Sequence, residues 1–293
     1  MFCESQSTPT VGGLPVGCAK NKLTARLNES GLDSRVLAIV AGHCSLRSGV
    51  DVSSFSLEDI LNEDNWCLNE FQRQGGELPL VLGHIRSALV VASCNRDCVV
   101  CFSGGYTQPG SGREYCEGES YLKVASRLVE LGMSPLIERS RLIVDEKAYS
   151  SGQNIIGSLE RYFLEFGAMP GFVLFISYPF KAERMLFIAR QLGLEGRMGY
   201  LCSEDPILNE GDYRREGEIC KRLISDPFLE DMLGEEYRKI LKRNYSNAAL
   251  PVLNPRDVAE YYRYQRDGFI DVSFLNDLIA QGRLSSLHRL ILA

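Results

Sequence analysis

Several polar residues of this chain follow directly after short apolar runs, at positions where a buried strand would end. The apolar runs are Val36–Val40, Cys98–Phe102, Leu142–Val144 and Phe172–Ile176. The polar residues that follow them are Gly42 and His43, then Ser103, Gly104 and Gly105, then Asp145, and finally Ser177. In a parallel α/β sheet the ligand binds outside the carboxyl ends of the strands. The pattern therefore predicts one polar site to which all four strands contribute.

A carboxylate and two cations extend this predicted site. Glu117 lies near the start of a predicted helix, where it can act as a general acid or base or can simply stabilise the helix dipole. Lys181 and Arg184 are three residues apart and share one face at the start of another predicted helix. Two cations there oppose the helix dipole, so a bound phosphate or carboxylate would relieve the repulsion. Two solvated side chains are the alternative interpretation.

Three further positions can bind or orient a ligand. Glycines at 104 and 105 allow backbone N–H groups to approach an anion closely, although a plain turn has the same composition. His43 occupies a position suited to a general base, although a lone histidine is more often a hydrogen-bonded polar residue. Asn154 is a poor helix former one turn inside a predicted helix, so we expect it to face the cleft, with Ser151 as the helix cap.

The chain carries no pattern typical of metal ligands or of a serine nucleophile elbow. Cys98 and Cys101 have the spacing of a redox pair, but residues three apart on a strand point to opposite faces of the sheet. No second Cys or His pair stands at zinc-finger spacing, and no Gly-x-Ser-x-Gly sequence is present. We therefore expect these thiols to be core residues and expect no bound metal.

The site needs a frame of strands and helices, and the sequence predicts one. Strands are expected at 36–40, 98–102, 142–144, 172–176 and 198–202, and helices at about 80–92, 117–131, 152–166 and 181–192. Gly132, Gly167 and Gly193 follow three of these helices, where a left-handed cap is expected. Strands that alternate with helices of this length are typical of a parallel sheet with right-handed crossovers. The predicted fold class is α/β, a mostly parallel sheet with helices on both faces.

Composition divides the chain into three segments. Residues 1–33 are rich in Gly, Pro, Ser and Asn, and we expect a loosely ordered lead-in with one short helix at about 23–28. Residues 34–205 form the predicted α/β core, with a polar loop at 44–64. Residues 206–293 carry helical patterns broken by prolines. They are expected to form a helical C-terminal extension that packs on the core or caps the site.

Composition also bounds the partners and the location. The chain has 293 residues, 45 % of them hydrophobic, and a formal net charge of −6 with a pI of about 5.3. This acidic balance, without long runs of Lys or Arg, argues against nucleic acid and against an anionic membrane surface as partners. No apolar stretch approaches the ~20 residues of a membrane span, and no signal peptide is expected. The sequence predicts a cytoplasmic protein with mostly reduced thiols.

The polar motifs follow one another in an order that resembles a known family. They are Gly42-His43, Trp66 with Phe71-Gln72, His84-Ile85, Phe102-Ser103-Gly104-Gly105, Glu117 before Ser120-Tyr121, Asp145 through Ser150-Ser151 to Asn154, and Ser177 with Lys181 and Arg184. Over roughly half of the chain, this series resembles the SanA/YdcF-like domain of unknown function, most closely its eukaryotic branch. The resemblance implies a Rossmann-like three-layer α/β/α fold with a polar cleft, and S-adenosylmethionine or a nucleotide as candidate ligands.

The chain departs from the family at three positions of the motifs. Asp145 stands in place of a Glu, Ser150 in place of an Asp or Asn, and Gln153 in place of a frequent Glu. If the family uses carboxylates at these positions, this chain has fewer of them. That difference favours a role without catalysis.

The leading hypothesis is an enzyme, a hydrolase or group transferase, that acts on a small anionic molecule such as a nucleotide-like one. The residues expected to hold the anion are Gly104, Gly105, Lys181 and Arg184. Those expected to orient or protonate the reacting group are Glu117, Asn154 and His43. The alternatives are a ligand-binding or regulatory module without catalysis, and a scaffold whose cleft is filled by its own side chains.

Overall fold

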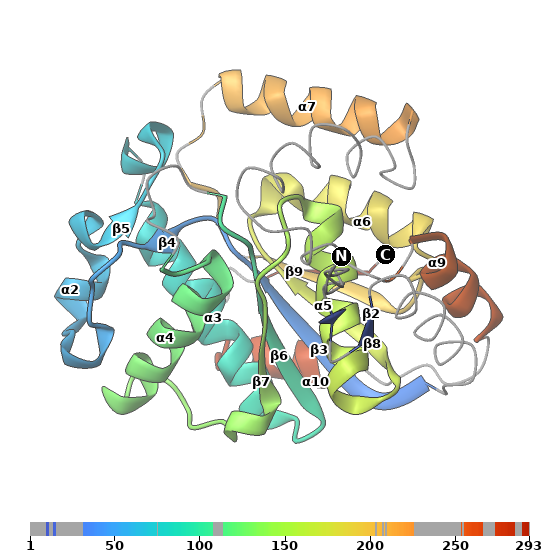
Figure 1. The fold of residues 1–293 in the computed structure, drawn as a ribbon, viewed down its shortest axis with the longest axis horizontal. Helices are drawn as coiled ribbons and strands as arrows, with labels where there is room; N and C mark the ends of the chain where they lie inside the picture. The colour runs from blue at the N-terminus through green and yellow to red at the C-terminus, as the bar shows by residue number, and fades with distance from the viewer. Residues whose placement is uncertain are drawn as a thin grey trace, which may run out of the picture.

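The computed structural model describes residues 10–11, 14–15, 32–74, 76–107, 114–202, 204–206, 208, 210–225, 253, 255–265, 273–284 and 289–292. Within them a six-stranded sheet crosses the molecule, with helices on both faces (Figure 1). Its strands are β3 (Leu32–Ala41), β6 (Cys98–Ser103), β7 (Leu142–Asp145), β8 (Met169–Ile176), β9 (Met198–Cys202) and β10 (Arg289–Leu292). The predicted α/β class and the three-layer Rossmann-like architecture are confirmed.

The strands lie across the sheet in the order β10-β9-β8-β3-β6-β7. Neighbouring strands are parallel, except that β10 runs antiparallel to β9 at one edge. The chain builds one half of the sheet from β3 to β7 and then crosses back to β8, so the strand order reverses between β3 and β8. In open α/β sheets ligands bind outside the carboxyl ends of the strands at such a reversal. The fold therefore marks the ends of β3 and β8 as the place for a site.

Helices cover both faces of the sheet. One face carries α3 (Glu77–Cys94), α4 (Glu117–Glu130) and α10 (Ser273–Ala280), and the other carries α5 (Ser151–Phe166), α6 (Ala182–Gln191) and α9 (Pro255–Tyr264). The central strands are buried on both sides, which explains why they occur in the sequence as continuous apolar runs. Cys98 and Cys101 lie in the cores on opposite faces, as their spacing predicts.

Local sequence explains where the helices begin and end. Gly132, Gly167 and Gly193 follow α4, α5 and α6 with φ of 70°, 71° and 71°, the left-handed conformation that was predicted. The cap of α5 is Ser150, whose Oγ accepts a hydrogen bond from the Gln153 N–H. The prediction that Ser151 caps this helix is wrong, because Ser151 is already its first helical residue.

The segment 44–64, expected to be a loop, contains several short elements. They are β4 (Ser45–Leu46), α2 (Leu57–Leu61) and two 3₁₀ turns, and β4 pairs with β5 (Trp66–Cys67). The fully buried Trp66 holds this region, since its indole N–H donates to the Ile60 carbonyl oxygen at 2.7 Å. Elements this short carry too little periodicity to be recognised from sequence.

The two ends of the chain also differ from the expectation. Besides α7 (Glu210–Ser225), α9 and α10, the C-terminal segment supplies β10, so it ends in an edge strand of the core sheet. Near the N-terminus β1 (Thr10–Val11) pairs with β2 (Leu14–Pro15), and β3 begins already at Leu32. The short helix expected at about 23–28 lies outside the described residues.

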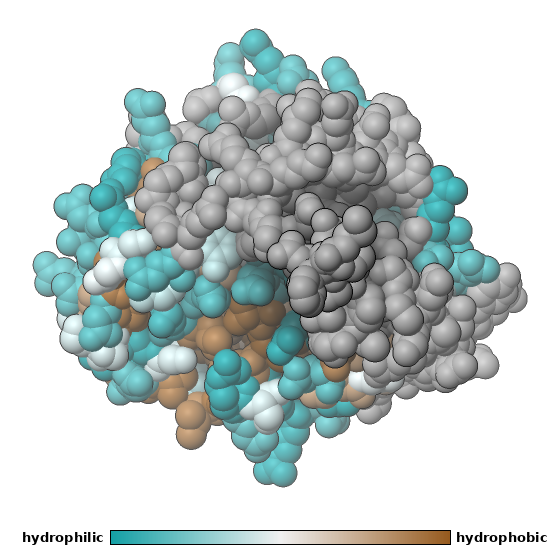
Figure 2. Space-filling view, in the orientation of Figure 1, coloured by the Kyte–Doolittle hydropathy of each residue, from teal (hydrophilic) through white to brown (hydrophobic). Residues whose placement is uncertain are grey.

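Among the residues that are coloured on the face seen in Figure 1, most are hydrophilic, with a hydrophobic patch in the region where β6 and β7 are drawn (Figure 2). Among the described helices, α3 is long and apolar enough to cross a membrane. However, 61 % of that stretch is buried inside the protein, as in the core helix of a globular domain. The cytoplasmic location stays a prediction.

Gly118 allows α4 to approach the sheet, because a Cβ at this position would lie 2.5 Å from the Phe102 carbonyl oxygen. We expect Gly118→Ala to lower the free energy of unfolding by about 1–3 kcal/mol, since backbone must shift to make room. Gly83→Ala in α3 is the matched control, because its added methyl meets no atom within 4 Å and alanine favours a helix by up to about 1 kcal/mol. Urea denaturation compares the two variants; equal stabilities would contradict the close packing of α4.

Candidate functional site

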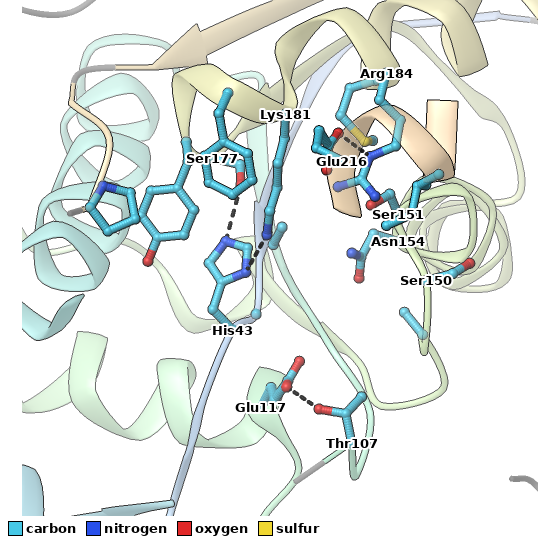
Figure 3. Close-up of a pocket in the computed structure, with 18 of the residues that line it drawn as sticks. His43, Thr107, Glu117, Ser150, Ser151, Asn154, Ser177, Lys181, Arg184 and Glu216 are labelled. Carbon is cyan, nitrogen blue, oxygen red and sulfur yellow. Dashed lines mark hydrogen bonds and ion pairs between the residues drawn. The ribbon is translucent and has the colours of Figure 1, made fainter. Parts of the chain in front are cut away.

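A cavity of about 400 Å³ lies at the carboxyl ends of the strands, where β3 and β8 are neighbours. The predicted site residues that line it are Gly42, His43, Glu117, Ser151, Asn154, Ser177, Lys181 and Arg184. Figure 3 shows Glu117 and Thr107 on one side of the cavity and Lys181 and Arg184 on the opposite side, with His43 between them. The predicted residues that do not line it are Ser103, Gly104, Gly105 and Asp145. Most of the predicted site is therefore brought together.

A chain of hydrogen bonds runs from the cavity into the protein. Lys181 Nζ lies 3.0 Å from Nδ1 of His43, and Nε2 of His43 lies 3.0 Å from Ser177 Oγ (Figure 3). The buried Ser177 is hydrogen-bonded to Tyr200, which donates to the Tyr178 carbonyl oxygen at 2.7 Å. An ammonium group can only donate, so Nδ1 of His43 must accept. We infer the other proton positions from this: Nε2–H donates to Ser177, and Ser177 donates to Tyr200.

This chain of hydrogen bonds changes the role expected of His43. Burial lowers the pKa of His43 well below its usual value, and Lys181, His84 and Arg184 lower it further. Its ring also stacks on Tyr178, with the ring centroids 4.5 Å apart. A neutral ring with both nitrogens in hydrogen bonds is poorly placed to take a proton from a ligand. The geometry therefore assigns His43 to holding Lys181 in position rather than to general-base catalysis.

Lys181 is the cation that the chain of hydrogen bonds presents to the cavity. It precedes α6, and its Nζ lies 5.3 Å from the ring centroids of Tyr178 and Phe180. Burial, followed by repulsion from Arg184, lowers the pKa of Lys181 to about 8, although Glu77 and other acidic neighbours oppose the shift. The amine is thus mostly protonated at neutral pH and loses its proton more readily than an exposed lysine.

Glu117 lies in a slot between two glycines. It is the first residue of α4, and a Cβ atom at either Gly42 or Gly104 would lie 2.5 Å from its side chain. Thr107 donates a hydrogen bond to its carboxylate (Figure 3). A larger residue at either glycine would displace this carboxylate. The space that these glycines leave is therefore occupied by the Glu117 side chain.

The loop after β6 does not offer the backbone groups expected to bind an anion. The Gly104 N–H donates to the Asp145 carbonyl oxygen at 2.9 Å, and the Gly105 N–H donates to the Ala148 carbonyl oxygen at 2.7 Å. Both N–H groups are already satisfied within the protein. The expectation that the backbone of Gly104 and Gly105 binds an anion is therefore wrong. These glycines instead allow close packing of neighbouring groups.

Ser103 and Asp145 are buried beside Asn154 rather than exposed in the cavity. Ser103 Oγ lies 2.7 Å from Asp145 Oδ2 and 2.8 Å from Asn154 Oδ1. Burial raises the pKa of Asp145 to about 6, although hydrogen bonds from Ser103 and from the Lys147 N–H oppose the shift. Ser103 therefore connects Asp145 to Asn154, which does line the cavity.

Sequence reasoning missed part of the cavity lining around His43. The Tyr178 hydroxyl donates to the Glu77 carboxylate, and Gln72 Nε2 donates to the His43 carbonyl oxygen at 2.8 Å. Burial raises the pKa of Glu77. Gln72 belongs to the motifs that carry the family resemblance, and Tyr178 directly follows Ser177, so both could have been found. Glu77 has no comparable signal, because an acidic residue at a helix start is common.

Arg184 meets a carboxylate from the C-terminal segment. Its Nε lies 3.0 Å from Oε1 of Glu216 on α7, and the two side chains are only 7 % and 13 % exposed (Figure 3). Asp212 and Ile219 of α7 also line the cavity. No spacing distinguishes Glu216 from the other acidic residues of α7, so the sequence could not have shown it. The C-terminal segment therefore supplies part of the site.

Two further sources of information on this site are possible metal ligands and similar proteins. Among the residues that the structure describes, no group of three or more His, Cys, Asp or Glu side chains could hold a metal ion. Comparisons with protein-family models, with curated proteins and with solved structures give no match.

The buried, neutral His43 should make stability depend on pH. Below about pH 6.5 the unfolded chain protonates this side chain while the folded protein does not, so His43 contributes a loss of stability as pH drops from about 7 to 5. The raised pKa of Asp145 contributes in the opposite direction, so the effect of His43 is measured against a variant. His43→Gln can bridge Lys181 and Ser177 without titrating, and should reduce this loss by up to about 1.4 kcal/mol per pH unit. Urea denaturation across this range measures the effect; identical pH dependence in both proteins would mean that the ring is not held neutral.

Proposed function

We propose that the protein is an enzyme, a hydrolase or group transferase, that acts on a small anionic molecule, with a nucleotide-like molecule as the first candidate. The observation that carries the proposal is that Lys181 and Glu117, each held by its own neighbours, face one cavity of about 400 Å³. This volume suits a small-molecule ligand. The position beside the reversal of strand order is where α/β folds commonly bind one.

Lys181 and Arg184 would bind the anionic group of this ligand. An ammonium already held by hydrogen bonds needs little reorganisation to stabilise negative charge that develops during a reaction. Ser150, Ser151 and Asn154 line the cavity at the start of α5. Their hydroxyl and amide groups, together with the positive end of the helix dipole, can bind phosphate, carboxylate or sugar oxygens.

Glu117 is the best-placed group for proton transfer. The slot between Gly42 and Gly104 and the hydrogen bond from Thr107 set the position of its carboxylate relative to a bound anion. In hydrolysis or group transfer it would take a proton from the attacking water or acceptor hydroxyl. Lys181 would meanwhile stabilise the charge on the group under attack.

A ligand-binding module without catalysis is the second candidate. Ser150 stands where the resembling family has an Asp or Asn, and Gln153 where it often has a Glu, and here both side chains are used within the protein. Ser150 Oγ accepts from the Gln153 N–H, and Gln153 Oε1 accepts from the Tyr149 N–H at 2.6 Å. A scaffold with a filled cleft is less well supported, because the side chains of α7 line the cavity without filling it.

Membership of the SanA/YdcF-like family is part of the proposal. The positions that carry the resemblance include Gln72, Glu117, Asn154 and Lys181, and all four line the same cavity. Residues from four separate motifs therefore lie where one ligand could contact all of them. S-adenosylmethionine and nucleotides are therefore the first ligands to test.

Binding can be tested with a thermal-shift panel of nucleotides, S-adenosylmethionine and phosphorylated metabolites. We expect a ligand at a hundred times its Kd to stabilise the wild type by about 2.7 kcal/mol. Lys181→Met should lose this gain because the anion loses its counter-ion, whereas Lys123→Met, an exposed lysine of α4, should keep it. Glu117→Gln should still bind the same compound but turn it over at least about a hundredfold more slowly.

The outcomes of that panel separate the candidates. Absence of stabilisation by every compound, in a folded wild type, would contradict the small-anion proposal. Binding without turnover by the wild type would instead favour the module without catalysis.

A further inference from the structure

Arg184 is the more deeply buried of the two cations that line the cavity, and its counter-ion comes from outside the α/β core. The contact between Arg184 Nε and Glu216 Oε1 is 3.0 Å long. Both atoms are shielded from solvent, yet within the described residues neither makes a hydrogen bond of acceptable geometry. The strongest arginine–carboxylate pairs form two parallel, aligned hydrogen bonds. This pair therefore leaves the Nε–H of a buried guanidinium without a well-formed hydrogen bond.

The surrounding charges make Glu216 an exchangeable partner. Burial raises the pKa of Glu216, even though Arg184 and Lys181 both act to lower it. The carboxylate is thus only partly compensated for its loss of water. Lys181 acts electrostatically on the same group, so two cations and one carboxylate share this end of the cavity. A ligand with an oxyanion would meet the same two cations.

We infer that Arg184 and Lys181 form an oxyanion subsite, and that Glu216 is an internal carboxylate that occupies it until the ligand displaces it. The inference rests on the proposed function, since it concerns the same cavity. The ligand is then an organic molecule that ends in a carboxylate or a phosphate group. An oxyanion has several acceptor oxygens, so it can accept the Nε–H hydrogen bond that Glu216 does not form with good geometry. When the ligand displaces Glu216, α7 loses a buried contact with α6. The packing of α7 therefore depends on whether the subsite is filled.

The chain offers a matched pair of variants for the test. Glu216→Gln removes the competing charge and keeps the shape of the side chain. Glu218→Gln makes the same change at an exposed position two residues further along α7. Calorimetric titration at constant ionic strength, with inorganic phosphate and with succinate as probes, measures affinity for each protein. We expect Glu216→Gln to bind the preferred probe at least tenfold more tightly than the wild type, and Glu218→Gln to match the wild type. The preferred probe identifies the phosphate or the carboxylate as the group recognised.

Hydrogen exchange of the wild type provides a second measurement that needs no variant. A saturating concentration of the preferred probe should speed amide exchange in α7, because its contact with Arg184 is released. Equal affinity of Glu216→Gln and wild type, or slower exchange in α7 with the probe bound, would overturn the inference while the proposed function stands. Failure of a folded Glu216→Gln to bind either probe would also overturn it. If, in addition, no compound of the thermal-shift panel stabilises the wild type, the proposed function fails as well.

Discussion

The half-buried ammonium group of Lys181 sets the arrangement of the cleft. The Lys181 side chain carries three donors and no acceptor, so any hydrogen-bond partner of its ammonium must be an acceptor. Because of this requirement, Nδ1 of His43 accepts a hydrogen bond and its Nε2–H donates to Ser177. The Ser177 hydroxyl in turn donates to Tyr200. Removal of a charge from water is costly unless hydrogen bonds replace the lost solvation. The bond to His43 supplies part of that replacement and holds the cation at the cavity.

The topology of the sheet makes this arrangement possible. His43 and Ser177 are 134 residues apart in the chain, and they meet only because β3 and β8 are neighbours where the strand order reverses. On the β6 side, Gly42 and Gly104 leave room for Glu117, which Thr107 holds. Two opposite charges thus reach one cavity from different elements, each with its own partners. That separation leaves both charges able to act on a ligand placed between them.

The sequence predicted the elements whose pattern is strong and local. Continuous apolar runs identified the parallel strands, and glycines at 132, 167 and 193 marked the helix ends, because a left-handed residue there leaves a recognisable trace. The polar residues at the strand ends predicted the position of the cavity, because they too form a local pattern. β10 was not predicted, since four residues on an edge strand do not differ from any other short apolar run.

Roles within the site were harder to predict than positions. The glycines at 104 and 105 suggested an anion-binding loop, but a glycine pattern does not say whether a ligand or a neighbouring side chain occupies the space that it leaves. His43 suggested a base, but its role depends on which partners its two ring nitrogens find, and those partners come from β8 and α6. The role of Glu216 could not be predicted from the sequence for a similar reason, since only the packing of α7 brings it to Arg184.

The most direct test of this account is the protonation state of His43, measured from the ¹⁵N chemical shifts of its ring. The chain contains three histidines, so single His→Gln variants suffice to assign the signals. We predict a neutral ring at pH 7 with its proton on Nε2 and none on Nδ1, because Lys181 donates to Nδ1. A ring with its proton on Nδ1, or an imidazolium at pH 7, would contradict the claim that a buried lysine cation organises the cleft.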